Sequence, residues 1–223
     1  MRRAPPPLPL ESTTELPAGA RRAALVFLAS AAIILWLPVA RALFGRPPGF
    51  LRDLGFWSGP RGTVLAWALA LAVALLYSTF AVRNIPLVRV HWRAVSAAKA
   101  LGIGAAFAAA IVEEAVFRRM LMDGLRSAGV PATLQVMASG VAFGAAHGLW
   151  GIVTGRTIAG AGAMVATGAL GTALAVVYVI GDRSLAPVIV SHFVITATIQ
   201  PGILFAAFSG QMPRPQPGWW RAV

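Results

Sequence analysis

Long apolar runs constrain the fold of this 223-residue chain more than any other feature. Hydrophobic residues make up 58% of the sequence and charged residues only 12%. In soluble domains, apolar residues account for roughly 45–50% and charged residues for about 25%. A helix needs about 20 mostly apolar residues to cross a bilayer, and this chain contains several such runs. The sequence therefore predicts an all-α, polytopic transmembrane helix bundle.

The apolar runs predict six spans, with seven or eight as alternative counts. They lie at about residues 23–42, 63–82, 97–125, 131–147, 158–180 and 185–199. Pro131 suits the start of the fourth helix, because proline is favoured at the first helical position. Pro201 is expected to kink or split whatever follows the sixth.

The two ends of the chain differ in composition from the apolar middle. Residues 1–20 are rich in proline and small polar residues and lack a helical period, which predicts a disordered tail. Residues 211–223 form a second short tail. The transmembrane domain is therefore expected to occupy residues 21–210.

The charge pattern excludes some function classes. The net charge is +12, but the arginines are spread over the chain ends and connections instead of forming a basic stripe. This fits topology control and contact with anionic headgroups, and it predicts a lipid-bilayer partner and no nucleic-acid partner. One lysine, Lys99, against eighteen arginines indicates a genomic compositional bias. Since there is no cysteine, disulfides and thiolate chemistry are excluded.

The third span carries charge where charge is costly. Glu113 lies about 18 Å from a helix end near residue 125. Placing an ionised carboxylate at that depth costs roughly several kcal/mol of free energy or more, unless the carboxylate is paired or faces a water-filled cavity. Glu114 and Arg118 are four residues apart, so they share a face and can pair. Glu113 points about 100° away from Glu114 and is left free for another role.

Two of the three histidines lie in apolar helices. His147 follows Phe143 by four residues, so the two rings share a helical face. His192 has Thr196 one turn later on its own face. A lone histidine in an apolar helix is usually a satisfied core residue. Two of them on separate helices, together with a free intramembrane glutamate, favour a functional site.

Residue types alone leave three kinds of chemistry open. The two imidazoles and Glu113 can bind a divalent metal that keeps a position open for water. Alternatively, Glu113 can act directly as general base on a water held by the histidines. The same groups can also form a proton relay in a transporter.

The order of the motifs adds information that the residue types do not. "EEAVFR" (113–118), "FGAAH" (143–147) and "HFVIT" (192–196) follow one another on separate apolar helices. This order resembles the CPBP intramembrane proteases, the family that contains type II CAAX prenyl endopeptidases and bacteriocin-processing proteins. The resemblance covers about residues 95–200, which would be the protease-like core.

The resemblance implies a role for each matching residue. Glu113 would activate water, and Glu114 with Arg118 would complete the first motif. His147 and His192 would bind the water or, with Glu113, a metal ion. Zn²⁺ is the first candidate for that ion, and a metal-free glutamate mechanism is the alternative.

Two further positions of the motifs bear on the site. Phe143 is expected to shape it. The third motif of the family usually ends in asparagine, whereas this chain has Thr196. An asparagine amide suits oxyanion stabilisation, so the substitution puts full activity in doubt.

The function implied is that of an intramembrane endopeptidase of the metallo- or glutamate type. Its substrate would be a membrane-anchored protein or peptide, and the bacterial character of the composition suggests the inner (plasma) membrane. The alternatives are a transporter or proton relay that uses the same buried charges, and a non-catalytic membrane scaffold of the same family.

Overall fold

The computed structural model describes residues 15–56, 62–153 and 157–212. The described residues form helices and no strand, which confirms the all-α fold class. The helices are α1 (Ala18–Gly45), α2 (Pro47–Asp53), α3 (Val64–Asn84), α4 (Pro86–His91), α5 (Ala97–Glu114), the π-helical segment η2 (Ala115–Met122), α6 (Asp123–Ser127), α7 (Ala132–Val153), α8 (Thr157–Ile180), α9 (Leu185–Ile199) and α10 (Gly202–Ser209).

Four described helical segments are long and apolar enough to cross a membrane: Ala18–Gly45, Val64–Asn84, Ala97–Ser127 and Thr157–Ile180. The pair α9 and α10 would supply a fifth; it is bent by 55° at a short break. This count agrees approximately with the six spans predicted. The break contains Pro201, so the expected split of the chain there is confirmed.

The helix boundaries correct the predicted ones at two places. Residues 18–20, which the sequence assigned to the N-terminal tail, belong to α1, and residues 1–14 lie outside the described part of the chain. The fourth predicted span is α7, and it continues to Val153 instead of ending near His147. His147 therefore lies inside a helix and not at its end. The predicted C-terminal tail covers residues 211–223, and residues 213–223 lie outside the described part of the chain.

Local sequence explains where several helices begin. Thr63 and Ser96 lie one residue before α3 and α5, and each side-chain oxygen accepts a hydrogen bond from a backbone N–H of the first turn. Such caps satisfy donors that have no partner within the helix. Proline at the first position starts α2 and α4, where its missing N–H costs nothing.

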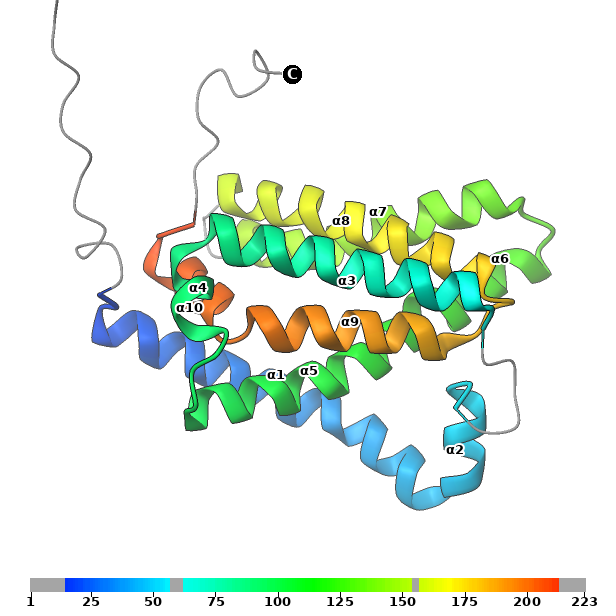
Figure 1. The fold of residues 1–223 in the computed structure, drawn as a ribbon, viewed down its shortest axis with the longest axis horizontal. Helices are drawn as coiled ribbons and strands as arrows, with labels where there is room; N and C mark the ends of the chain where they lie inside the picture. The colour runs from blue at the N-terminus through cyan, green and yellow to red at the C-terminus, as the bar shows by residue number, and fades with distance from the viewer. Residues whose placement is uncertain (1–14, 57–61, 154–156, 213–223) are drawn as a thin grey trace, which may run out of the picture.

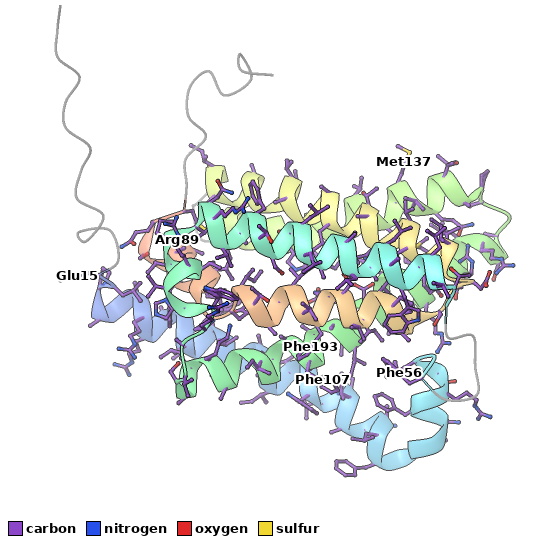
Figure 2. The ribbon with its side chains drawn as sticks, in the orientation of Figure 1. Glu15, Phe56, Arg89, Phe107, Met137 and Phe193 are labelled. Atoms are coloured by element: carbon purple, nitrogen blue, oxygen red, sulfur yellow. The ribbon has the colours of Figure 1, made fainter. Side chains whose placement is uncertain are left out.

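Helix α9 runs through the middle of the bundle (Figure 1). It packs against α3 on one side and α5 on the other, while α1 covers α5 and α7 packs along α8. Most of the first half of α9 is buried, including Leu185, Val188 and Ile189. Figure 2 shows Phe107 of α5 beside Phe193 of α9, and these rings meet edge to face with centroids 5.9 Å apart. A histidine on α9 can therefore be reached from α5.

Candidate active site

The two adjacent glutamates of the third predicted span end α5, and a π-helical segment, η2, follows them directly. Together with α6 these elements form one continuous stretch, Ala97–Ser127, of 31 residues, with Glu113 near its middle. A π-helix is rare and tends to occur at functional sites. The sequence did not predict it.

Glu114 lies in the buried interior of the site. Its Oε2 is 2.8 Å from Nε of Arg118, and both side chains are completely buried. The predicted pair therefore forms. The second oxygen, Oε1, accepts a hydrogen bond from Nδ1 of His192 at 2.8 Å. One carboxylate thus neutralises a buried cation and orients an imidazole on another helix.

Glu113 faces the two histidines. Its Oε2 lies 3.6 Å from Nε2 of His147 and 3.7 Å from Nε2 of His192. Both distances are too long for a direct hydrogen bond, and this buried oxygen has no hydrogen-bond partner among the described residues. The structure therefore brings together the three residues on α5, α7 and α9 that the sequence singled out.

The hydrogen bonds of the imidazoles determine which ring nitrogen faces Glu113. Nδ1 of His147 lies 2.9 Å from the backbone carbonyl oxygen of Phe143. A carbonyl can only accept, so this Nδ1 carries the proton. Nδ1 of His192 carries one as well, because it donates to the carboxylate that is paired with Arg118. In the neutral form of each ring, Nε2 presents a lone pair toward Glu113.

Access to the site is unequal. The side chain of His147 is 35% exposed and that of Glu113 23%, whereas His192 is 5% exposed. The site is thus open on the side of α7 and closed on the side of α9. A substrate would meet Glu113 and His147 first.

Phe143 forms the wall of the site. Its ring stacks on His147 with centroids 4.5 Å apart and meets His192 edge to face at 5.6 Å. Gly171 of α8 lies behind it, and a Cβ atom there would come within 2.8 Å of the Cβ of Phe143. The ring is therefore held between α8 and the imidazoles, and the expectation that Phe143 packs against the site is confirmed.

Thr196 and the third histidine, His91, make no hydrogen bond or ring contact with this cluster. Thr196 is half-buried on α9, and its hydroxyl makes no hydrogen bond with any described residue. His91 ends α4, where Nδ1 hydrogen-bonds to the carbonyl of Leu87 and the ring packs against Phe205. His91 therefore belongs to the packing of α4 on α10.

Two polar residues in the structure were not predicted from the sequence. Ser139 of α7 accepts a hydrogen bond from Nη1 of Arg118 at 2.6 Å. Lys99 of α5 donates to three backbone carbonyls at the end of α9: those of Ala197 at 2.5 Å, Thr198 at 3.2 Å and Gln200 at 2.8 Å. The sequence interpretation treated the lone lysine only as a sign of compositional bias. The position of Lys99 within an apolar run indicates that its ammonium group has buried hydrogen-bond partners.

The site was tested for its fit to a divalent metal. Two imidazoles whose other nitrogen is hydrogen-bonded, together with a carboxylate, have the donor chemistry of a Zn²⁺ site. However, the described residues contain no group of three or more His, Cys, Asp or Glu side chains arranged to hold a metal ion. The described side chains therefore do not form a complete ligand set for a metal ion.

Comparison with known proteins found a family model that resembles part of the chain. The chain matches the family model of type II CAAX prenyl endopeptidases, Rce1-like, over residues 95–198. This range begins just before α5 and ends within α9, so it includes Glu113, His147 and His192. Comparisons with curated proteins and with solved structures found no match. Residues 95–198 are thus similar to the Rce1-like type II CAAX prenyl endopeptidases, which agrees with the resemblance to the CPBP intramembrane proteases that the motifs indicated.

Proposed function

We propose that this protein is an intramembrane endopeptidase in which Glu113 activates the water that hydrolyses a peptide bond. The observation that carries the proposal is the position of Glu113 Oε2, which lies 3.6 and 3.7 Å from two imidazole nitrogens and has no hydrogen-bond partner. Three acceptor atoms converge there without a donor. A water molecule bound there would donate its two protons to two of these three acceptors.

Each group has a part in the reaction. Glu113 Oε2 takes a proton from the water molecule. At the same time the water oxygen attacks the scissile carbonyl carbon, and a C–O bond forms. Glu113 then returns the proton to the leaving nitrogen as the C–N bond breaks, which is ordinary general acid–base catalysis. The products are a carboxylic acid and an amine, and Glu113 is restored to its ionised form.

The histidines hold and polarise the reacting groups. His192 receives support from the Glu114 carboxylate at Nδ1, an arrangement that fixes the orientation of the ring. His147 is the more exposed imidazole, and we assign to its Nε2 the acceptance of a hydrogen bond from the attacking water. The guanidinium of Arg118 lies against the Glu114 carboxylate and compensates its charge.

The substrate we propose is a membrane-anchored protein or peptide, cleaved within reach of the bilayer. Glu113 lies near the middle of a helical segment long enough to span a membrane, yet its side chain is 23% exposed. A peptide held to the bilayer by an apolar group can approach such a site without leaving the membrane. The inner membrane of a bacterium is the location that this proposal assumes.

The test is a cleavage assay with the full chain reconstituted in liposomes. A fluorogenic farnesylated peptide with a CAAX end serves as the probe, because the family acts on such C-termini. We expect cleavage by the wild type, loss of cleavage in Glu113→Gln, and unchanged cleavage in Asp53→Asn, which alters an exposed carboxylate. Cleavage retained in Glu113→Gln overturns the mechanism. Proton flux in the same liposomes, lost with Glu113→Gln while no peptide is cut, would support a transporter instead.

A further inference from the structure

We infer that Ser139 of α7 is a positioning residue that holds His192 and His147 in their places relative to Glu113. The inference rests on the proposed function, since it concerns the same site. Ser139 does not touch Glu113 or either imidazole. Its influence would pass through Arg118 and through the helix that it shares with His147.

The hydroxyl of Ser139 is used as both acceptor and donor. It accepts from Nη1 of Arg118 at 2.6 Å and donates to the backbone carbonyl of Phe117 at 3.1 Å. The side chain is completely buried, so water does not compete for either bond. Both partners belong to η2, and Ser139 therefore fastens α7 to the π-helical segment by a side chain and by the backbone.

The bond to Arg118 begins a series of contacts, two hydrogen bonds and one ion pair, that ends at the imidazole of His192. Arg118 donates to Ser139 through Nη1 and faces Glu114 through Nε. Glu114 in turn accepts from Nδ1 of His192. These contacts join α7, η2, α5 and α9. Nε and Nη2 of Arg118 have no hydrogen-bond partner among the described residues, so Ser139 supplies the only hydrogen bond that they give to this guanidinium group. Removing the hydroxyl would take that bond away in a dry interior, where the group would shift to find another acceptor.

The same helix carries the second imidazole. His147 lies eight residues, about two turns, after Ser139 on α7, so a bond that fixes α7 against η2 also fixes His147 against Glu113. Another contact between η2 and α7 is the edge-to-face packing of Phe117 on Phe143, with centroids 5.1 Å apart. That contact is apolar and allows sliding, whereas the two hydrogen bonds of Ser139 define one register.

A buried serine in a helix usually has a simpler role. Most such hydroxyls bond back to the carbonyl four residues earlier in their own helix. Thr167, Thr172, Thr198 and Ser209 do so in this protein. Ser139 does not follow this pattern, because both of its hydrogen bonds reach another helical segment and neither goes to its own helix. A hydroxyl that only filled space would have no reason to do so.

Enzyme kinetics give the first test. We expect Ser139→Ala and Ser139→Cys to lower kcat by about 10- to 100-fold, the range typical for residues that orient catalytic ligands. KM should stay within about twofold, because substrate binding is not altered. Ser139→Thr keeps the hydroxyl and should recover most of the lost rate. The matched control is Ser191→Ala: Ser191 is also buried and also bonds across helices, to the carbonyl of Ala70 at 2.8 Å, but lies outside this series of contacts.

A spectroscopic test does not depend on turnover. The chain has three histidines, so selective ¹⁵N-histidine labelling yields few signals, and a His192→Gln variant assigns the Nδ1–H of His192. Ser139→Ala should shift that resonance, and Ser191→Ala should leave it in place. An unchanged resonance together with an unchanged kcat in Ser139→Ala would overturn the inference. If the wild type cleaves no peptide, the proposed function fails, and the His192 resonance alone then decides whether Ser139 positions it.

Discussion

The imidazole of His192 donates its Nδ1 proton to Oε1 of Glu114 across 2.8 Å. The two residues are 78 positions apart in the chain, and this bond ties α9 to the end of α5. It gives Glu114 two tasks, because the same carboxylate also neutralises Arg118. The two neighbouring glutamates therefore differ in what their loss would do.

Glu114→Gln should damage stability much more than Glu113→Gln does. Removing the negative charge leaves the guanidinium of Arg118 buried and uncompensated, which costs about 3–5 kcal/mol when a buried pair is broken on one side. Thermal unfolding of both variants in one detergent measures the difference. Glu113→Gln is the matched control, since Glu113 is partly exposed and contacts no arginine among the described residues. Equal melting temperatures would contradict the assignment of Glu114 as the structural carboxylate.

Cleavage should persist when a strong chelator is present. The described residues do not form a group of three ligands arranged for a metal, and the proposed base acts on water directly. The measurement is the initial rate with and without chelator, followed by metal analysis of the purified protein. A rate that collapses with chelator and returns with added Zn²⁺ would instead assign Glu113, His147 and His192 as metal ligands.

Thr196→Asn should raise kcat. The hydroxyl of Thr196 makes no hydrogen bond with a described residue, and a carboxamide reaches further from the same helical face as His192. One well-placed oxyanion donor is worth about 10²–10³ in rate, so a gain of up to about 10² is expected. Thr198→Asn is the control, because that threonine bonds to the carbonyl of Val194. No gain in Thr196→Asn would show that another group already stabilises the oxyanion.

Lys99→Met should loosen the junction between α9 and α10. The ammonium group donates to three carbonyls where α9 ends, and methionine keeps the apolar stem but removes every donor. Buried carbonyls left without a partner cost about 1–3 kcal/mol each. Hydrogen exchange of amides in α9 and α10 should accelerate, and the melting temperature should fall. Arg22→Met, which removes an exposed cation from α1, should change neither.

Much of this fold could be predicted because a membrane span is a local property of the sequence. Apolar length alone located helices such as α3 and α9 to within a residue or two. The likeness of the motifs to the family pointed to Glu113, His147 and His192, and the structure brings the three together. The i, i+4 rule also predicted the pair of Glu114 with Arg118.

What could not be predicted depends on contacts between helices. Nothing in the spacing of residues 115–122 distinguishes a π-helix from an α-helix, and the π-helical segment η2 lies where the chain packs on α7. Ser139 resembles any small residue of an apolar helix until Arg118 is placed opposite it. The hydrogen bond of His192 to Glu114 likewise depends on how α5 and α9 are arranged in space.

The occupied Nδ1 atoms have a consequence for covalent labelling. Each imidazole of the site offers an electrophile only its Nε2 atom, because Nδ1 is engaged with Phe143 or Glu114. His147 is 35% exposed and His192 5%, so a histidine-directed warhead would alkylate His147 first and at one atom. The chain has no cysteine to divert the reagent. A tagged imidazole-reactive probe would thus report occupancy of the site by competition, even before a natural substrate is identified.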